Sequence, residues 1–398
     1  MRPRIVLLLA AATVSAAFLS TESLVAQQDV HMARALRVLS STPLIDGHND
    51  LPWAIRRSEV APHDVEADAH DLRVSTPFHT DIERLRAGMV GGQFWSVYTP
   101  FESTLEGAAK VQLEQIDIAL QVIAKYPEVF ELALDASDVQ RIFASGKIAS
   151  MMGMEGGHAI ENSLGALRAF YTMGVRYMTL THNGTLDWAD AANGEQVHDG
   201  LTNFGEEVVR EMNRMGMLVD LSHTAPSTMN DALDVAMAPV IWSHASARGV
   251  WDHPRNVPDQ VLRRLPDNGG VVMVTFVPSF VSEGDEATIA QVADHIDHIA
   301  TIAGVDHVGI GSDFDGITST PVGLEDVSTF PALFAELSRR GWSEGGLAKL
   351  AGENLLRVMN QAETVARRLQ RERGPSMATI EQLDGGEGES GAFGGRHE

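Results

Sequence analysis

The sequence predicts a (β/α)8 barrel of the TIM type, with a metal site at the carboxyl ends of its strands. Three observations lead to this fold class. Eight short apolar segments alternate with stretches of helical periodicity between about residues 30 and 370. Eight strand–helix units in roughly 340 residues match a closed barrel better than an open sheet. A histidine or an acidic residue ends or closely follows six of the eight apolar segments.

The expected strands are short, and turn residues or helical stretches separate them. In chain order they cover residues 43–46, 92–98, 149–155, 177–182, 217–222, 239–243, 270–276 and 307–311. Apolar residues recur at helical spacing over residues 105–125, 164–173, 204–215, 287–303 and 331–340. Pro127 stands just beyond the first of these helices, where a proline typically follows a helix end. This alternation predicts parallel strands that are joined by helices.

The two ends of the chain differ from this pattern. Arg2 and Arg4 precede an apolar run that continues to Ser20, and small residues follow as far as Ala26. This arrangement is typical of a secretory signal peptide, and the run is shorter than the roughly 20 apolar residues of a membrane span. We expect residues 1–26 to be a signal peptide and residues 30–370 to form a single barrel domain. The Gly-rich residues 374–398 are expected to form a flexible tail.

Composition limits the chemistry and the partners. The chain has no cysteine, which excludes disulfides, thiol catalysis and thiolate metal ligands. Any metal must therefore be held by carboxylates and by the 15 histidines. A formal net charge of −24 makes nucleic acid an unfavourable partner. With the export signal, the composition favours a location in the bacterial periplasm or outside the cell.

Five metal-competent side chains gather at the predicted strand ends. His48 and Asp50 follow the first strand, Glu155 ends the third, and His223 and His244 follow the fifth and sixth. Burying these groups without partners would be costly, whereas divalent ions would satisfy them together. Five ligands exceed the three that one catalytic zinc typically takes. We therefore expect two Zn2+ ions that share Glu155, one on His48 and Asp50 and the other on His223 and His244, with manganese or cobalt as alternatives.

Two further side chains are expected to take part in catalysis. Asp313 follows the eighth strand. The five residues above already supply the expected metal ligands, so Asp313 would instead move a proton from water to a leaving group. The alternative is that Asp313 orients a ligand histidine. His182 ends the fourth strand and is a candidate for stabilising a developing oxyanion. A hydroxide shared between two ions is a nucleophile at neutral pH, so the predicted reaction is hydrolysis.

Several composite motifs together resemble those of a known family. They are LIDGHNDLPW (44–53), GGQFWSVYTP (91–100), QLEQID (112–117), GMEGGH (153–158), LTHN (180–183), LVDLSH (218–223), APVIWSH (238–244), RNVPD (255–259) and HVGIGSDFDG (307–316). In this order they cover the chain from about residue 43 to 360. The sequence resembles the membrane (renal-type) dipeptidase family, which are zinc metallopeptidases of the amidohydrolase-like barrel group.

The resemblance implies roles for particular residues. It implies a dinuclear zinc site bridged by Glu155, with Asp313 as the acid/base group. It implies that His182 contacts the carbonyl or tetrahedral centre of the substrate. It also adds Arg255, which would bind the carboxylate of a dipeptide; without the resemblance, a loop-locking role for this arginine is equally expected. A free dipeptide is then the substrate, with a D-residue tolerated at its second position, and a homodimer is possible.

Some of the chain departs from the family or leaves alternatives open. Phe280 stands where a substrate-facing tyrosine is expected in mammalian members, which leaves the substrate preference open. Related chemistry on the same barrel, as in a deacylase, a lactonase or a β-lactam hydrolase, is one alternative function. A non-catalytic periplasmic peptide-binding protein is another. His295 and His298 lie three residues apart on an expected helix, and we expect them on a solvated charged face.

Overall fold

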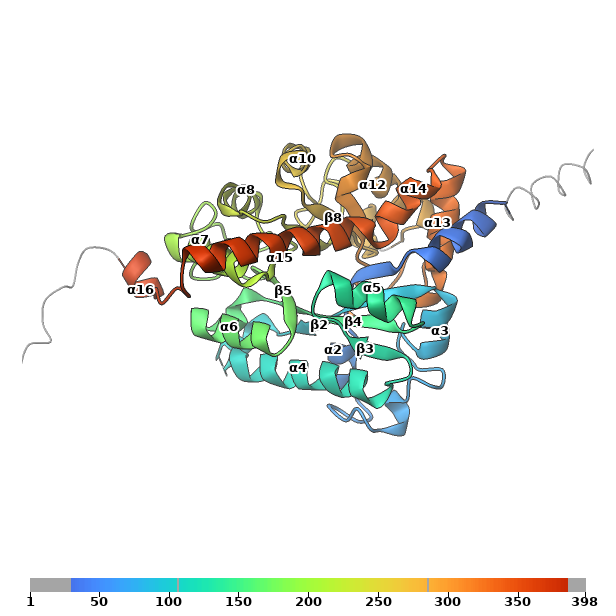
Figure 1. Ribbon diagram of the computed structural model, residues 1–398, viewed down its shortest axis with the longest axis horizontal. Helices are drawn as coiled ribbons and strands as arrows, with labels where there is room; N and C mark the ends of the chain where they lie inside the picture. The colour runs from blue at the N-terminus through green and yellow to red at the C-terminus, as the bar shows by residue number, and fades with distance from the viewer. Residues whose placement is uncertain (1–29, 106, 285, 386–398) are drawn as a thin grey trace, which may run out of the picture.

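A computed structural model describes residues 30–385 except 106 and 285 (Figure 1). The expected signal peptide and residues 386–398 of the expected tail lie outside the described residues. Eight parallel strands form the centre of the molecule. They are β1 (Leu44–Asn49), β2 (Val90–Tyr98), β4 (Ile148–Glu155), β5 (Val175–Thr179), β6 (Leu218–Asp220), β7 (Ile241–Ala245), β8 (Val271–Val274) and β9 (Val308–Ile310).

The pairing of these strands closes a ring. β1 lies between β2 and β9, and the pairing continues through β8, β7, β6 and β5 to β4, which pairs again with β2. All of these pairs are parallel. The predicted (β/α)8 barrel is therefore confirmed. All eight strands overlap the segments that the sequence predicts.

One short strand was not predicted. β3 (Phe130–Leu132) pairs with the first residues of β4, while β5 pairs with the last residues of β4. Three residues are too few to show a strand periodicity in the sequence. β3 therefore extends the sheet beside the barrel and is not one of the strands that close it.

Helices follow most strands and cover the outside of the barrel. They are α2 (Leu51–Arg56), α3 (Ile82–Ala87), α4 (Ala108–Lys125), α5 (Ala136–Ala144), α6 (Leu164–Thr172), α7 (Asn203–Met215), α8 (Pro226–Val235), α9 (Asp259–Leu262), α10 (Leu265–Asn268), α11 (Pro278–Val281), α12 (Ile289–Ile302), α13 (Phe330–Arg339), α14 (Glu344–Ala348), α15 (Asn354–Glu372) and α16 (Ile380–Leu383). Within the described residues, no helix combines the length and the apolar character that crossing a membrane requires.

Local sequence signals set the helix ends. Thr288 caps α12 by accepting a hydrogen bond from the backbone of Gln291, whose side chain in turn accepts one from the backbone of Thr288. Thr202 caps α7 in a similar way, and Gly216 ends α7 with a left-handed φ of 87°. These caps satisfy backbone groups that the first and last helical turns leave without partners.

The long helix α15 lies across the amino-terminal end of the barrel (Figure 1). Arg357 on α15 donates to the backbone oxygens of Gly269 and Asp306, which precede β8 and β9. Glu363 accepts a hydrogen bond from the backbone of Ala136, at the start of α5. α15 therefore closes this end of the barrel, and the functional side chains gather at the opposite, carboxyl-terminal end.

Part of the expected tail has a defined position. α16 lies beside the start of α7, where Asp384 accepts hydrogen bonds from the Thr202 hydroxyl and the Phe204 backbone. Arg168 on α6 donates to the backbone oxygen of Ser376. Residues 374–385 therefore pack against the barrel domain, whereas we had expected a flexible tail from residue 374.

Candidate metal centre

The barrel brings the predicted ligands together at one end. Glu155 is the last residue of β4, and His48 and His244 are the second-to-last residues of β1 and β7. Asp50 directly follows β1, and His223 lies three residues beyond β6. The carboxyl ends of parallel strands share one face of a barrel, so these five side chains converge although they span about half of the chain.

Glu155 lies between His48 on one side and the pair His223 and His244 on the other. Its Oε1 atom is 3.1 Å from His223 Nε2 and 3.3 Å from His244 Nε2, while its Oε2 atom is 3.5 Å from His48 Nε2. The Ser96 hydroxyl donates a hydrogen bond to Oε2 at 3.3 Å. The two oxygens of one buried carboxylate thus face different ligand groups, which is the arrangement that a bridging ligand needs.

The ligand atoms form three overlapping clusters, in each of which all atoms lie within 4.8 Å of one another. The clusters are His48, Glu155 and His244; Glu155, His182 and His223; and His48, Asp50 and Asp313. His48 Nε2 lies 3.2 Å from Asp50 Oδ2, as expected for one ligand pair, and His223 Nε2 lies 2.9 Å from His244 Nε2, as expected for the other. His182 and Asp313 also lie within reach of a metal, which the sequence did not indicate.

Hydrogen bonds behind the histidines select their tautomers. The Tyr177 hydroxyl donates to the backbone oxygen of Gly47 and lies 2.8 Å from His48 Nδ1, so His48 Nδ1 carries the proton. The Ser243 hydroxyl donates to Asp220 and lies 2.9 Å from His244 Nδ1, which therefore also carries a proton. In both histidines the Nε2 lone pair then points at the carboxylates.

This donor set fits a divalent metal. His48 Nε2 is buried and has no hydrogen-bond partner among the described residues. Burial alone would lower the pKa of His48, but the electrostatic interactions with Tyr177, Glu155 and Asp50 raise it well above its ordinary value, so this position favours a cation, either a proton or a metal ion. Burial lowers the pKa of His244 to about 3 and also lowers the pKa of His223, so both rings are neutral, as metal ligation requires.

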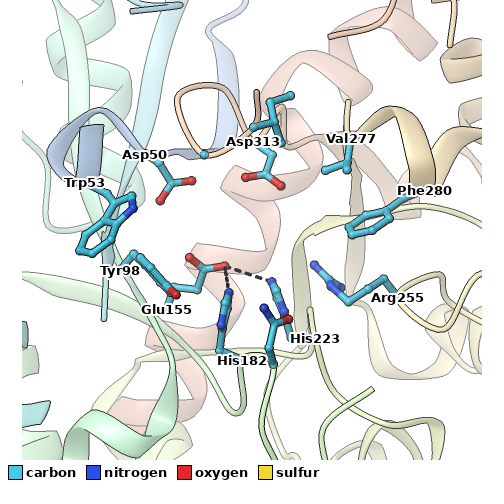
Figure 2. A pocket seen from close by; sticks show the side chains of 13 residues that line it. Asp50, Trp53, Tyr98, Glu155, His182, His223, Arg255, Val277, Phe280 and Asp313 are labelled. Carbon is cyan, nitrogen blue, oxygen red and sulfur yellow. Dashed lines mark ion pairs between the residues drawn. The ribbon is translucent and has the colours of Figure 1, made fainter. Parts of the chain in front are cut away.

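Asp313 lies above Glu155 at the mouth of the barrel (Figure 2). Its backbone has a left-handed φ of 68°, and its N–H donates to the backbone oxygen of His48. Burial raises the pKa of Asp313 well above its ordinary value, and the nearby carboxylates of Asp50 and Glu155 raise it further. A Cβ atom on Gly316 would lie 2.4 Å from Asp50 Oδ2 and 2.7 Å from Asp313 Oδ1, so a larger residue at this position would displace both carboxylates.

His182 lies three residues beyond β5, because β5 ends at Thr179 and not at residue 182 as expected. Its Nε2 atom is 3.8 Å from Glu155 Oε1, and its ring lies against those of His223 and Tyr98. Burial lowers the pKa of His182, so the ring is a neutral group at the pocket wall.

Arg255 places a positive charge beside this cluster (Figure 2). Its side chain is buried, and its Nε and Nη1 atoms have no hydrogen-bond partner among the described residues. Nη2 makes one long hydrogen bond, 3.4 Å, to the backbone oxygen of His244. Burial lowers its pKa to about 10, which still leaves the guanidinium charged at neutral pH. A buried cation with unused donors is suited to binding an anionic group.

A pocket of about 320 Å³ connects these groups. Besides the predicted residues, its walls contain Trp53, Tyr98, Asn183, Val277, Phe280 and Ile317. Trp53 lines the pocket, whereas Trp95 and Trp188 are buried in the core. Tyr177, Ser243 and Asp220 could not be predicted from the sequence, because nothing in a buried strand marks a polar residue as the partner of a particular histidine.

A family model decides what kind of protein this is. The model described as "Membrane dipeptidase (Peptidase family M19)" matches residues 32–373, which include every side chain of the site. The chain belongs to the membrane dipeptidase family. Members of this family are metal-dependent hydrolases that act on dipeptides, and the metal-competent clusters of this chain agree with such an activity.

Solved structures of dipeptidases and metallopeptidases share the fold. A metallopeptidase of the same family, dipeptidase AC, is 28% identical with a TM-score of 0.73, over 81% of this chain and 99% of its own. A metallopeptidase from Rhodobacter sphaeroides, liganded with a phosphinate mimic of the dipeptide L-Ala-D-Ala, is 27% identical with a TM-score of 0.72, over 81% of this chain and 99% of its own. The "probable dipeptidase PvdM" from Pseudomonas aeruginosa is 21% identical with a TM-score of 0.78, over 85% of this chain and 100% of its own, which supports the fold alone.

Proposed function

We propose that this membrane dipeptidase is an exported enzyme that holds two zinc ions and hydrolyses free dipeptides, including those with a D-residue at the second position. The observation that carries the proposal is the position of Glu155. Its Oε1 faces His223 and its Oε2 faces His48. Arg255 lies across the same pocket, and two of its guanidinium nitrogens have no hydrogen-bond partner among the described residues. The pocket thus offers a place for metal ions and a place for a carboxylate.

The ligand assignment follows the two sides of Glu155. His48 and Asp50 would hold one ion beside Oε2, and His223 and His244 would hold the other beside Oε1. Nitrogen and oxygen ligands without sulfur agree with zinc. When bound, such ions lower the pKa of water and polarise the scissile carbonyl.

The chain's own residues then bind the substrate and move the protons. Arg255 binds the carboxylate of the second residue and so fixes the peptide bond in the pocket. His182 is near enough to the cluster to contact the carbonyl oxygen as negative charge develops on it. The Asp313 carboxylate takes a proton from the attacking water as the C–O bond forms, and gives it to the amide nitrogen as the C–N bond breaks.

Two parts of the proposal rest on other observations. The structure of the Rhodobacter sphaeroides metallopeptidase contains a mimic of L-Ala-D-Ala. This ligand supports the proposal that the present chain also acts on L-D dipeptides. Export rests on the basic and apolar character of residues 1–26 alone. Fusing residues 1–26 to a periplasmic reporter tests export. The expected homodimer also stays a prediction, which the sedimentation behaviour of the purified protein tests.

The experiment that tests the activity follows the release of free amino acids from L-Ala-L-Ala and L-Ala-D-Ala by the purified protein. It is run with the isolated metal-loaded enzyme and after treatment with a zinc chelator, and the metal content is measured alongside. N-acetylated and C-amidated dipeptides serve as blocked controls. We expect chelator-sensitive hydrolysis of the free dipeptides and two zinc ions per chain.

The controls separate the alternatives. Hydrolysis of the blocked substrates would indicate a broader amidohydrolase, such as a deacylase. Tight dipeptide binding without hydrolysis by the loaded protein would indicate a peptide-binding protein. One zinc per chain in an active enzyme would contradict the dinuclear assignment and leave the dipeptidase activity standing.

A further inference from the structure

Two histidines on α12 lie outside the metal-ligand cluster. His295 and His298 are three residues apart, so they lie on the same side of the helix. We expected them on a solvated charged face, which is wrong: His295 is fully buried, and the His298 side chain is only 24% exposed. Their contacts show which part of the molecule they hold.

Both ring nitrogens of His295 bond to backbone groups. The Ala247 N–H donates to His295 Nδ1 at 3.0 Å, and His295 Nε2 donates to the backbone oxygen of Val281 at 2.9 Å. Ala247 begins the loop after β7 that carries Arg255, and Val281 is the last residue of α11. Burial lowers the pKa of His295, which agrees with a neutral ring that donates from one nitrogen and accepts at the other. His295 thus joins the Arg255 loop to α11.

His298 contacts the far end of the same loop. His298 Nε2 lies 2.8 Å from Oδ1 of Asp259, the first residue of α9. The loop backbone also approaches this pair closely, because a Cβ atom on Gly249 would lie 2.5 Å from His298 Nε2 and 2.6 Å from Asp259 Oδ1. One turn of α12 therefore holds the loop near both of its ends.

α11 in turn supports Arg255 directly. The guanidinium of Arg255 lies over the ring of Phe280 on α11, 5.2 Å from the ring centroid. The ring of His253 in the loop is stacked on the Phe280 ring, with a centroid distance of 4.5 Å. The Asn256 side chain donates to the backbone oxygen of Phe280 at 2.8 Å. The loop and α11 therefore form one unit around the guanidinium.

The hydrogen bonds of Arg255 itself do not hold the guanidinium firmly. Two of its three nitrogens have no hydrogen-bond partner among the described residues, and the third makes only the 3.4 Å contact to His244. The place of the charge in the pocket must therefore come from the loop and from the Phe280 ring. We propose that His295, assisted by His298, is a positioning residue for Arg255, because it fastens the Arg255 loop to α11. This inference rests on the proposed function, in which Arg255 binds the substrate carboxylate.

The test compares His295→Leu with His295→Asn and with a control at the other end of the barrel. Leucine removes both hydrogen bonds, whereas the amide oxygen of asparagine lies near the position of Nδ1 and can still accept from the Ala247 N–H. The control is His307→Leu. His307 is also a buried histidine with a backbone bond, from Nδ1 to the Gly270 oxygen at 2.7 Å, but it lies at the amino-terminal end of the strands.

Two measurements are made on each metal-loaded variant. The first is kcat and KM for L-Ala-D-Ala. We expect His295→Leu to raise KM about tenfold, because the released loop would displace the guanidinium of Arg255, a charged hydrogen-bond donor to the substrate. We expect kcat to change much less. We expect His295→Asn, which keeps one of the two bonds, to have a KM between those of the wild type and His295→Leu, and His307→Leu to leave KM unchanged. The second measurement is amide hydrogen exchange, which should become faster over residues 246–257 and 277–281 in His295→Leu only.

Each outcome decides the inference. A wild-type KM in His295→Leu, or an equal rise in His307→Leu, would overturn it, because the effect would then be absent or a general loss of stability. Normal exchange over residues 246–257 in His295→Leu would overturn it as well. If the wild-type protein hydrolyses no dipeptide, the proposed function fails, and the exchange pattern still decides whether His295 holds the loop.

Discussion

The Tyr177 hydroxyl on β5 lies 2.8 Å from His48 Nδ1 on β1, although these two strands are not neighbours in the barrel. Tyr177 therefore reaches across the barrel interior and holds a candidate metal ligand from behind. The same hydroxyl donates to the backbone oxygen of Gly47, which leaves it able only to accept from the ring. The bond keeps the proton on Nδ1 and the Nε2 lone pair directed at Asp50 and Glu155.

We predict that Tyr177→Phe weakens metal binding by about 10- to 100-fold, because the ring of His48 loses the partner that sets its tautomer. Competition with a chromophoric chelator measures the affinity. Tyr126→Phe is the matched control, since Tyr126 is another buried tyrosine, whose hydroxyl accepts from the Leu72 backbone away from the site. Equal affinities in the two variants would contradict a role for Tyr177 in metal binding.

We predict that Asp313→Asn lowers kcat by about 100-fold or more while the metal content is unchanged, because the amide cannot carry the proton. Asparagine is chosen because it tolerates the left-handed φ of 68° at this position. Asp315 has the same φ, but its carboxylate accepts a bond from the His79 backbone, so Asp315→Asn is the control and should lose far less activity. Loss of metal from Asp313→Asn would instead indicate that Asp313 is a ligand.

We predict that Arg255→Met raises KM for free dipeptides by roughly 10- to 100-fold, since a charged hydrogen-bond donor to the carboxylate is lost. Arg255→Lys should restore little of this binding, because an ammonium lacks the planar pair of donors. Steady-state kinetics on L-Ala-D-Ala checks both variants. If KM is unchanged in Arg255→Met, Arg255 has the loop-locking role that the sequence left open.

The buried carboxylate of Glu211 joins α6, α7 and the C-terminal segment. It accepts two hydrogen bonds from Arg214 at 2.8 Å, one from Arg168 at 3.0 Å and one from the Ser376 backbone. Burial alone would raise its pKa, but the bonds to Arg214 and Arg168 hold the pKa below the ordinary value of 4.5. The unfolded chain therefore binds this proton more readily than the folded protein, so the stabilisation is present above pH 4.5 and is lost as the pH falls through the folded pKa.

We predict that Glu211→Gln lowers the free energy of unfolding at neutral pH by about 3 kcal/mol, because two arginines lose a buried partner. The variant should also lose less additional stability than the wild type below about pH 4. Urea unfolding at both pH values measures this difference. Glu206→Gln is the control on the same helix, since Glu206 is a half-exposed partner of Arg210 and should contribute less than about 1 kcal/mol.

Much of the fold could be predicted from local patterns in the sequence. The alternation of apolar segments and helical stretches located all eight barrel strands, because each such signal lies within a few residues. β3 and the packed residues 374–385 were missed because neither has such a local signal in the sequence. β3 is three residues long, and α16 is held in place by Asp384 against Thr202, a contact between distant parts of the chain.

For the site, the sequence by itself determined the six strand-end positions that carry His48, Asp50, Glu155, His223, His244 and Asp313. Parallel strands place their carboxyl ends on one face, so residues that follow the strands meet without any knowledge of the loops. The tertiary structure alone decided which partners these groups have. Tyr177 contacts His48 across the barrel, and the burial of His295 depends on the Arg255 loop and α11 packing against α12. A histidine pair at helical spacing has the same sequence pattern on a solvated face and in a buried joint, and only long-range packing distinguishes them.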